Sequence, residues 1–518
     1  MNNSVEIKSA LISVYNKDGL EPIVRRLYDQ GVTLISTGGT WDFINGLGLM
    51  CIKVESMTGF PAIFGGRVKT LDPHVFGGIL ARRGNEDDLK EMREHNIHDI
   101  DLVIVDLYPF EETLKKTADE AEIIEKIDIG GISLIRAAAK NFNDVMVCAS
   151  RDDYGELLEL LQTEKCAISL ADHKKFAAKA FATSSHYDTK IFNYFNRETE
   201  FPLLRISENN SRVLRYGENP HQKGWFEGKL EEMFEILSGK ELSYNNLLDL
   251  DAAVRFIKPF WPSSKDCVFG ILKHTNVCGF AMKKLTGLDE IYRLALAGDP
   301  VSAFGGIFVT NKNVDKRTAE AIGDHFFEIF IAPGYKSDAL EILKKKKDRR
   351  ILKLKNVNLI PSLEIRSALN GYLTQEGDAK FVTTEEIKIV TKYEPTESQI
   401  EDMLLADTVV KSLKSNAIAL VANGVLIGMG SGQVSRIDAL RQAIEKARTH
   451  FPEEFPTGNV VMASEAFFPF PDCVELAHEN GINLVIQPGG SKQDQKSIDF
   501  CNSHNMSMIL TGIRHFKH

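Results

Sequence analysis

Several features that define specialised protein classes are missing from this sequence. Its 518 residues include only seven cysteines. They are scattered and never spaced as Cys-x-x-Cys, so we expect neither a disulfide framework nor a structural zinc site. No apolar run approaches the roughly 18 residues of a membrane span, and the polar start of the chain lacks the apolar core of a secretory signal. Free thiols without a leader indicate a cytoplasmic protein.

Positive charge is also in short supply. The 62 lysines and arginines are outnumbered by 72 aspartates and glutamates, which gives a net charge of −10. This balance argues against nonspecific nucleic-acid binding, which needs a basic surface to displace counterions. Apolar residues at 43% and charged residues at 26% are ordinary for packed domains. At about 150 residues per domain, the length predicts about three to four units.

Short apolar runs alternate with amphipathic stretches in residues 1–150. An amphipathic helix is expected at Leu20–Tyr28, because Ile23, Val24 and Leu27 share one face. The predicted strands are Ala10–Tyr15, Thr33–Thr37, Met50–Val54, Leu102–Leu107 and Asp144–Cys148. Strands separated by helices predict a parallel sheet with crossover connections, which binds ligands at the carboxyl ends of its strands.

The remaining chain predicts a helical stretch and then a second α/β region. Residues 154–197 read as helical, and Glu198–Arg212 reads as a domain junction. Further strands are expected at Val268–Lys273, Gly306–Thr310, Glu328–Ala332, Ala417–Ala422, Val460–Ala463, Ile482–Ile486 and Met506–Thr511, with a helix at Ile437–Ala447. We therefore expect a core domain over 1–150, a helical extension over 151–199, and a domain over 200–518 made of two lobes that divide near 364–392.

Three glycine-containing loops in the first region have the chemistry of an anion site. Ser36–Thr40 follows a strand and opens a helix, Gly66–Thr70 carries two cations, and Asp128–Gly131 opens a helix that bears Arg136 and Lys140. Glycines let backbone N–H groups approach an anion, and hydroxyls add donors at a helix N-terminus. Each loop alone could be an ordinary turn, but three together favour a binding site.

The second region concentrates polar side chains at the ends of apolar strands. Arg215–Gln222 holds six hydrogen-bonding side chains in eight residues, and Lys273-His274-Thr275-Asn276 ends a strand. A lysine beside a histidine disfavours the imidazolium and leaves a neutral base. The tail Arg514–His518 could fray or close a site. These residues predict a two-part α/β enzyme that binds anions, and they leave its substrate open.

A dozen motifs in register give the chain a specific resemblance over its whole length. They are SVYNK, STGGT, GRVKTLDPHVFGGIL, DLYPF, IDIGGISLIRAAAKN, LRYGENPHQ, SYNNLLDLDAA, KHTNVCG, DPVSAFGGI, SGQVSR, ASEAFFPF and RHFKH. In this order they resemble the bifunctional purine-biosynthesis family that joins IMP cyclohydrolase to AICAR formyltransferase.

The resemblance implies the last two steps of IMP synthesis. The C-terminal part would transfer a formyl group from the co-substrate 10-formyltetrahydrofolate to AICAR, and the N-terminal part would close formyl-AICAR to IMP with loss of water. The implied fold is α/β, with an N-terminal methylglyoxal-synthase-like doubly wound parallel sheet and two C-terminal cytidine-deaminase-like lobes without zinc. The resemblance also implies a homodimer with shared formyltransferase sites, no active-site metal, no nucleic-acid partner and no membrane partner.

The family's functional residues can be carried onto matching positions. For cyclisation the implied catalytic residues are Lys69, Tyr108, Asp128 and Lys140. The implied substrate pocket consists of Ser13, Lys17, Ser36, Thr37, Gly38, Gly39, Arg67, Thr70, Asp106 and Ile129. For formyl transfer the implied catalytic residues are Lys273 and His274. The implied substrate contacts are Arg215, Tyr216, Asn246, Gly305, Glu328, Asn416, Arg436, Ile437, Phe467, Asp472, Ser491, Lys492, Arg514 and His518.

The chain departs from the family pattern at four positions, namely Asn16, Asp18, Asp106 and Val277. The two added carboxylates would repel a phosphoribosyl group unless they face away or are paired. Two other functions stay open. Residues 1–199 could be a catalytically silent nucleotide-binding module, against which the four implied cyclisation residues argue. The chain could also be a plain deaminase, against which the missing zinc-ligand motifs argue.

Overall fold

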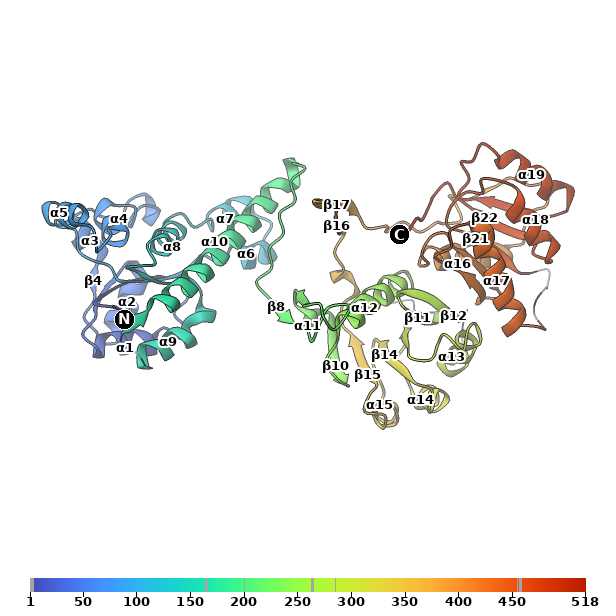
Figure 1. The fold of residues 1–518 in the computed structure, drawn as a ribbon, viewed down its shortest axis with the longest axis horizontal. Coiled ribbons are helices and arrows are strands. Elements are labelled where there is room, and N and C mark those ends of the chain that lie inside the picture. The colour runs from blue at the N-terminus through green and yellow to red at the C-terminus, as the bar shows by residue number, and fades with distance from the viewer. Residues whose placement is uncertain are drawn as a thin grey trace. The chain divides into compact units, whose positions relative to one another are not determined.

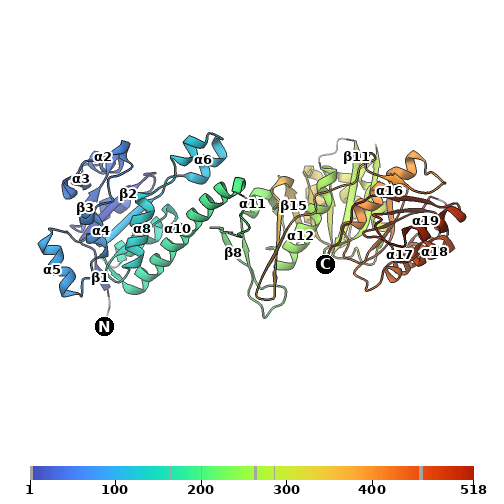
Figure 2. The same cartoon turned by 90° about the horizontal axis from the view of Figure 1, so that it is seen from above.

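The computed structural model describes residues 4–163, 166–199, 201–261, 265–284, 286–453, 455 and 459–518. It divides into two compact units, Met1–Asn210 and Ser211–His518, which are drawn together in Figures 1 and 2. The division falls inside the stretch that reads as a junction. Residue 200, where the C-terminal domain is expected to begin, lies outside the described residues.

A five-stranded parallel sheet forms the centre of the first unit, as predicted. Its order is β4-β3-β2-β5-β6, and every neighbouring pair is parallel. The strands are β2 (Ser9–Val14), β3 (Thr33–Ser36), β4 (Ile52–Lys53), β5 (Leu102–Asp106) and β6 (Met146–Cys148). The apolar side chains of β2, β3, β5 and β6 are buried on both faces because helices cover both, whereas the edge strand β4 is exposed, and this is the doubly wound arrangement that the alternating pattern predicts.

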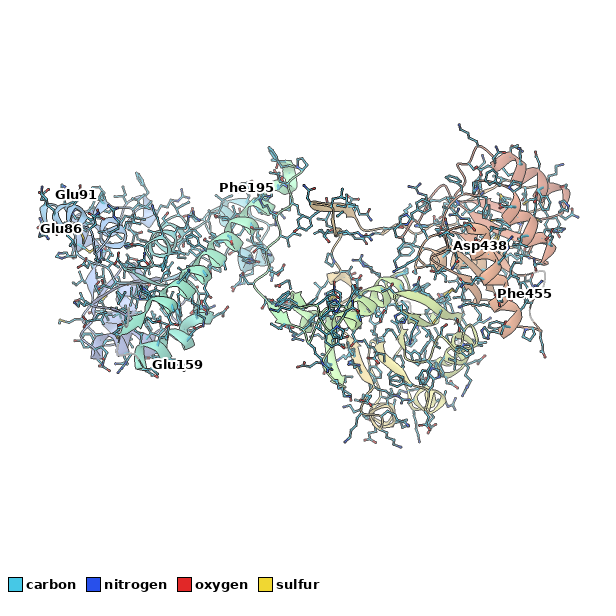
Figure 3. All side chains as sticks on the ribbon, viewed as in Figure 1. Glu86, Glu91, Glu159, Phe195, Asp438 and Phe455 are labelled. Atoms are coloured by element: carbon cyan, nitrogen blue, oxygen red, sulfur yellow. The ribbon has the colours of Figure 1, made fainter. Side chains whose placement is uncertain are left out.

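The helices of the first unit form a layer on each face of the sheet. One face is covered by α1 (Glu21–Asp29), α2 (Gly38–Gly46) and α9 (Tyr154–Thr163). The other is covered by α4 (Pro73–Leu80), α8 (Gly130–Lys140) and part of α10 (Leu170–Thr199). The shorter helices are α3 (Val54–Thr58), α5 (Glu86–Glu94), α6 (Phe110–Lys116) and α7 (Glu120–Ile124). On α5, Glu86 and Glu91 lie at the surface (Figure 3).

The expected helical stretch over 154–197 is interrupted, so that prediction was wrong in its middle. Helix α9 ends at Thr163, and β7 (Ala167–Ser169) pairs antiparallel with β1 (Ser4–Glu6) before α10 begins. Ile168 is fully buried there. Three residues are too few to show a period of two, so the strand is hidden between two strongly helical sequences.

The second unit is built around one mixed sheet of twelve strands. Its order is β10-β15-β14-β13-β11-β12-β20-β19-β21-β22-β23-β18. The strands are β10 (Phe234–Ser238), β11 (Asp266–Lys273), β12 (Asn276–Lys284), β13 (Gly306–Thr310), β14 (Phe327–Ala332), β15 (Arg350–Leu354), β18 (Lys388–Ile389), β19 (Ile418–Ala422), β20 (Val425–Gly430), β21 (Val461–Ser464), β22 (Leu484–Gln487) and β23 (Ser507–Leu510). A separate pair, β8 (Ser211–Val213) and β9 (Trp225–Glu227), precedes the sheet.

The unit contains the same succession of elements twice. Each copy has a helix, an antiparallel hairpin and three parallel strands linked by helices: α12, β11–β12 and β13 to β15 in the first, and α16, β19–β20 and β21 to β23 in the second. The helices are α11 (Leu230–Met233), α12 (Tyr244–Ile257), α13 (Leu288–Ala297), α14 (Lys316–Ile322), α15 (Ser337–Lys344), α16 (Glu397–Val410), α17 (Arg436–His450), α18 (Asp472–Glu479) and α19 (Asp494–Ser503).

The two copies share a sheet rather than forming separate cores. Strand β12 pairs with β20, with Ala281 opposite Val425. Between the copies, β16 (Leu363–Ala368) and β17 (Gly371–Glu376) form an exposed antiparallel hairpin. The polar segment near 364–392 is therefore a connection between two halves of one structure.

Candidate active sites

Two ammonium groups in the first unit converge on the Gly38–Gly39 turn. A Cβ added to Gly38 would lie 4.0 Å from Nζ of Lys69, and one added to Gly39 would lie 4.0 Å from Nζ of Lys17. Burial lowers the pKa of Lys17, and the nearby charge of Lys69 lowers it further, against the opposing effect of Asp106. The turn is thus lined by two cations where β3 ends and α2 begins.

At the N-terminus of α2, the N–H groups of Thr40 and Trp41 donate to the Thr37 carbonyl, whereas those of Gly38 and Gly39 have no acceptor among the described residues. The N-cap residue, Thr37, makes no side-chain capping bond. The Thr37 hydroxyl instead lies 3.4 Å from Oγ of Ser13, at the end of the neighbouring strand β2. Free N–H groups, the helix dipole and two ammonium groups are the components of a phosphate site. These residues of the predicted pocket are therefore brought together.

Two other members of the predicted pocket are occupied by protein partners. The Ser36 hydroxyl is fully buried and donates to the carbonyl of Ile12 at 2.6 Å. The Arg67 guanidinium pairs with Glu125, whose Oε1 accepts from Nε at 3.2 Å. Ser36 thus ties two strands together, and Arg67 must exchange partners before it can bind an anion.

An acid–base cluster surrounds the start of α8. Gly131 donates its backbone N–H to Oδ1 of Asp128 at 2.6 Å. Burial raises the pKa of Asp128, although backbone hydrogen bonds from Gly131, Tyr108 and Ile132 and the charge of Lys69 oppose the shift. Burial and the Asp128 charge raise the pKa of the Tyr108 hydroxyl. Lys69, Tyr108 and Asp128 therefore act on one another, and a carboxyl with a raised pKa suits proton transfer near neutral pH.

The remaining first-unit residues lie around this cluster or away from it. A Cβ on Gly130 would meet Oγ1 of Thr70 at 3.0 Å, so the buried Thr70 hydroxyl packs against the start of α8. Ile129 is exposed immediately before that helix. Lys140 is at the other end of the 11-residue helix. At about 1.5 Å per residue, roughly 15 Å of helix separates Lys140 from the Asp128 end, so the structure does not bring Lys140 into the cluster.

The two additional carboxylates share a cation. Oδ2 of Asp106 accepts the backbone N–H of Asn16 at 2.9 Å. Arg151 lies 3.9 Å from Oδ1 of Asp106 and 3.9 Å from Oδ2 of Asp18. Asp106 thus shapes the loop after β2, and Arg151 partly neutralises both charges.

We expect Asp106→Asn to lower the Michaelis constant for a phosphoribosyl substrate by about two- to fivefold at low salt, because it removes a negative charge and leaves Arg151 paired with Asp18 alone. The amide oxygen can still accept the Asn16 N–H, so the loop should keep its shape. The effect should shrink at high ionic strength. Cyclisation kinetics at two salt concentrations measure it, and no change at low salt would mean that Arg151 already neutralises Asp106.

In the second unit, His274 occupies a strained turn. His274 and Thr275 form the two-residue connection of the β11–β12 hairpin, with φ angles of 50° and 65°. Positive φ at both positions is the type I′ pattern, which favours Asn and Gly and is costly for a β-branched threonine. Strained non-glycine residues cluster at functional sites because the surrounding structure must hold them there.

Neighbouring elements hold this turn in place. Nζ of Lys273 donates to the carbonyls of Phe304 and Gly305 at 2.7 and 3.1 Å. The Thr275 N–H donates to Oδ1 of Asp249 on α12 at 2.9 Å. Burial raises the pKa of Asp249, while that N–H and the charges of His274 and Lys273 oppose the shift. Asp249 is not among the residues predicted from the sequence, although it lies within the SYNNLLDLDAA motif.

Several predicted substrate contacts lie beside this turn. Asn246 is buried at the start of α12, and its amide lies 3.5 Å from Oε1 of Glu328, which Arg350 binds at 2.6 Å. Gly305 has a φ of 69° and lies against the Lys273 ammonium. Arg215 is exposed and lies over the ring of Tyr216, with 5.5 Å between the guanidinium carbon and the ring centroid.

A second group gathers at the start of α17. Arg436 donates to Oδ1 of Asn416 at 3.0 Å, to Oε1 of Glu465 at 2.9 Å and to the carbonyl of Phe467 at 3.3 Å. Its side chain is only 9% exposed, and that of Glu465 is fully buried. Arg436 therefore positions Asn416 and Phe467 instead of offering a free charge. Glu465 is not among the residues predicted from the sequence.

The other predicted contacts surround the ends of β21, β22 and β23. Ile437 is the second residue of α17 and Asp472 is the first of α18. Ser491 and Lys492 follow β22, where Asp494 accepts the Ser491 N–H at 3.0 Å. Arg514 and His518 are exposed residues of the tail after β23. The His518 carbonyl accepts a long bond of 3.4 Å from Arg366.

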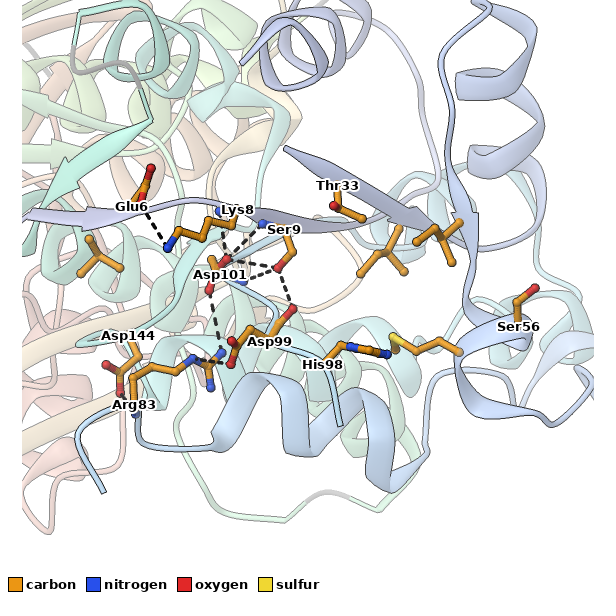
Figure 4. A pocket seen from close by; sticks show the side chains of 14 residues that line it. Glu6, Lys8, Ser9, Thr33, Ser56, Arg83, His98, Asp99, Asp101 and Asp144 are labelled. Atoms are coloured by element: carbon orange, nitrogen blue, oxygen red, sulfur yellow. Dashed lines mark hydrogen bonds and ion pairs between the residues drawn. The ribbon is translucent and has the colours of Figure 1, made fainter. Parts of the chain in front are cut away.

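A cavity of about 600 Å³ in the first unit lies elsewhere. It opens at the amino ends of the strands, beside Ser9, Thr33 and Asp101 (Figure 4). Arg83 pairs there with Asp99 at 2.9 Å, and Asp101 accepts from the N–H groups of Lys8 and Ser9. These contacts join β2 to the loop before β5, so the polar residues that line the cavity have a structural role in holding these segments together.

The described residues also bear on metal binding and on membrane insertion. Among the described residues, no group of three or more His, Cys, Asp or Glu side chains is placed to hold a metal ion. No helix in the described ranges is long and apolar enough to cross a membrane. All seven cysteines are free thiols, and six of them are buried.

Known families match the chain along most of its length. A family model described as AICARFT/IMPCHase bienzyme matches residues 138–446, and a model described as MGS-like domain matches residues 19–133. A relative from Bacteroides thetaiotaomicron is 53% identical over 518 residues, covering 100% of both chains. Relatives from Aquifex aeolicus and Acetivibrio thermocellus are 43% and 44% identical, covering 98% and 99% of this chain and 100% of their own. All three are named "Bifunctional purine biosynthesis protein PurH".

Proposed function

The chain belongs to the AICARFT/IMPCHase bienzyme family and is a bifunctional enzyme of purine biosynthesis, with AICAR formyltransferase and IMP cyclohydrolase activities; from this premise we propose where each reaction takes place. Cyclisation is assigned to the first unit and formyl transfer to the second. The observation that carries the first assignment is the position of Lys69, which lies beside the Gly38–Gly39 turn and acts on the charge of Asp128.

Cyclisation begins with the phosphoribosyl group of formyl-AICAR at the turn. The free N–H groups of α2 and the Lys17 ammonium hold the phosphate, which places the base towards the acid–base cluster. Ring closure joins the carboxamide nitrogen to the formyl carbon, and the formyl oxygen becomes an oxyanion. Lys69 and the Tyr108 hydroxyl donate to that oxygen, which later leaves as water.

Asp128 supplies the proton transfers in this scheme. Its carboxylate accepts a proton from the attacking carboxamide nitrogen and returns it to the oxyanion. The former formamide nitrogen gives up the second proton as the ring C=N bond forms and the C–O bond breaks, so the oxygen leaves as water and the proton count balances. The raised pKa of Asp128 brings its proton affinity nearer to neutral pH than that of an ordinary carboxylate. Lys140 is proposed for the same reaction on the resemblance alone, and its own variant is needed to test it.

Formyl transfer is proposed at the β11–β12 turn. The 5-amino group of AICAR attacks the formyl carbon of 10-formyltetrahydrofolate, the C–N10 bond breaks, and N10 takes a proton. The amine is a weak nucleophile because its lone pair delocalises into the imidazole and carboxamide, so orientation and proton removal dominate the rate. His274 removes the amine proton, and Lys273 and Asp249 hold the turn.

We propose that Arg215, Tyr216, Asn246 and Asn416 bind AICAR. Arg436 contributes by positioning Asn416. The folate donor is assigned to the remaining second-unit positions, which are Gly305, Glu328, Ile437, Phe467, Asp472, Ser491 and Lys492, with Arg514 and His518 closing the site.

A cytoplasmic homodimer is also proposed. The exposed β16–β17 hairpin supports it, because Leu363, Ile365, Tyr372 and Leu373 present apolar side chains without cover in one chain. Light scattering of the purified protein measures the subunit number.

A fragment of residues 1–210 should close supplied formyl-AICAR at a rate within about threefold of the full chain and transfer no formyl group. The fragment extends beyond 199 because Ser207 binds His186 at 3.0 Å and Glu208 lies 3.7 Å from Lys190, which fixes the end of the unit against α10. Assays with formyl-AICAR, and with AICAR plus 10-formyltetrahydrofolate, measure the two reactions. A folded fragment that cannot cyclise would favour the silent nucleotide-binding module.

A further inference from the structure

A cluster of charges lies at the C-terminal tail of the second unit, in which His515 and Asp407 are buried and Asp378 is at the surface. His515 is 2% exposed. Its Nδ1 is 2.6 Å from Oδ2 of Asp378, and its Nε2 is 3.7 Å from Oδ2 of Asp407. Lys411 lies 3.1 Å from the other oxygen of Asp378. None of these four residues has a part in the proposed chemistry.

The four residues come from three distant parts of the chain. Asp378 follows β17, Asp407 and Lys411 face it from α16, and His515 lies in the tail after β23. Burying charges is costly unless they are paired, and removing one partner leaves the others uncompensated. The cluster therefore fixes the tail against α16 and against the connection between the two halves.

The charges of the two carboxylates determine which of them accepts a hydrogen bond from His515. Burial would raise the pKa of Asp378, but the hydrogen bond and charge of His515 and the charge of Lys411 outweigh it and hold that pKa below its usual value. Asp378 is thus ionised and accepts from Nδ1–H. Burial raises the pKa of Asp407 to about 6, against the opposing charges of His515 and Lys411. The short contact of His515 is therefore the one from Nδ1 to Asp378, whereas Nε2 lies 3.7 Å from Asp407, beyond hydrogen-bond distance.

The tail is attached again two residues later. The His515 N–H donates to the Glu465 carbonyl at 2.9 Å. Ser415 donates its N–H to the Lys517 carbonyl at 2.8 Å, and Lys517 donates its N–H to the Ser415 hydroxyl at 3.1 Å. Glu465 also holds the Arg436 guanidinium, and Ser415 directly precedes Asn416. Both attachments are therefore made to neighbours of predicted substrate contacts.

Exposure alternates along the tail because the backbone is extended there. His515 is buried and Lys517 half-buried, whereas Arg514, Phe516 and His518 are exposed. Alternate side chains of an extended segment point in opposite directions. Because the side chains of His515 and Lys517 are anchored inward, those of Arg514 and His518 both point outward.

We infer that His515, clamped between Asp378 and Asp407, is a positioning residue that holds Arg514 and His518 at the formyltransferase site. The inference rests on the proposed function, which assigns those two residues to that site. Without the clamp the tail keeps the same side chains and loses their fixed placement. Substrate binding should therefore weaken more than the chemical step.

The test uses His515→Gln and Asp378→Asn in the full-length protein, with steady-state constants for formyl transfer. We expect the Michaelis constant for AICAR or 10-formyltetrahydrofolate to rise about tenfold or more, the scale of one charge-assisted buried hydrogen bond. The turnover number should fall less than about threefold. Damage to folding gives the opposite pattern, because it lowers the active fraction and leaves the Michaelis constants of the remaining enzyme unchanged.

Two further variants sharpen the comparison. Asp378→Glu keeps the carboxylate and should restore the Michaelis constants to within about threefold. His478→Gln is the matched control, because it removes a histidine of the same half that binds Asn483 at 3.1 Å and has no place in the clamp. Cyclisation of supplied formyl-AICAR should be unchanged in all four variants.

Unchanged Michaelis constants for both substrates in the two clamp variants would overturn the inference. If His515→Gln does not fold, Asp378→Asn decides alone, since the Asp378 side chain is 43% exposed. Failure of the proposed function is a separate result, in which the unmodified protein transfers no formyl group. In that case the attachment of the tail is measured by carboxypeptidase digestion. Faster release of the last residues from Asp378→Asn than from the unmodified chain supports the inference, and equal release contradicts it.

Discussion

Replacing His274 with alanine should slow formyl transfer by about 10²–10⁴-fold, the usual contribution of a positioned general base. AICAR should still bind, because its proposed contacts Arg215, Asn246 and Asn416 do not depend on the imidazole. Cyclisation of supplied formyl-AICAR should be unchanged, because we assign it to the other unit. Both turnover numbers, AICAR affinity and thermal stability are measured on one preparation.

The variant also separates catalysis from packing. A histidine needed only for the fold would lower melting temperature, AICAR affinity and turnover together when it is removed. Histidine is among the residues that tolerate a positive φ, so alanine at position 274 should cost a small amount of stability, and retained AICAR affinity with lost turnover is the result that identifies a base. Near-normal formyl transfer in His274→Ala would remove this residue from the mechanism and make Lys273 or His518 the next candidate base.

Replacing Lys69 with alanine should have the reverse selectivity. Cyclisation should fall by about 10²–10³-fold, the cost of removing one donor to a developing oxyanion, while formyl transfer continues and formyl-AICAR accumulates. Accumulation of formyl-AICAR from AICAR and 10-formyltetrahydrofolate, followed by chromatography, measures the result.

Two other lysines make this test specific. Lys90→Ala on α5 removes a surface lysine that pairs with Glu94, and it should leave both reactions unchanged. Lys140→Ala tests the residue that the structure places at the far end of α8. Normal cyclisation in Lys69→Ala would refute the proposed cluster, and a large loss in Lys140→Ala alone would move the chemistry to the other end of that helix.

The sequence predicts the parallel core of the first unit well and the hairpins of the second unit poorly. The five core strands are short apolar runs that alternate with amphipathic helical stretches, so the alternation of strands and helices is clear in the sequence. Strands β12 and β20 were missed because glycines interrupt their patterns. A Cβ at Gly279 would lie 2.3 Å from the Ala295 carbonyl on α13, and one at Gly428 would lie 2.2 Å from the Ala443 carbonyl on α17. Each glycine marks a helix packed directly on its strand, which local sequence cannot reveal.

Site residues that lie in recognisable motifs could be proposed from the sequence, whereas the residues that contact them could not. Motifs indicated Lys69, Asp128 and His274 before any geometry was known. Asp249 and Glu465 have no distinctive spacing, and they matter because folding places them beside His274 and Arg436. The same limit explains Arg436, which is among the implied substrate contacts but is paired with a buried carboxylate.

The duplicated halves of the second unit imply an order of folding. The hairpin β19–β20 turns at Asn423-Gly424, with φ angles of 51° and 74°, and this dipeptide favours such a turn. The equivalent hairpin β11–β12 turns at His274-Thr275, which oppose the same conformation. An isolated hairpin forms in about 1–10 μs when its turn is favourable. The second half can therefore nucleate the sheet from local contacts. The strained turn of the first half must be held by α12 and by the loop around Ser431 before its hairpin is stable. The Ser431 hydroxyl donates to Asn276 at 2.7 Å. The half that carries the proposed base is thus the half that folds last.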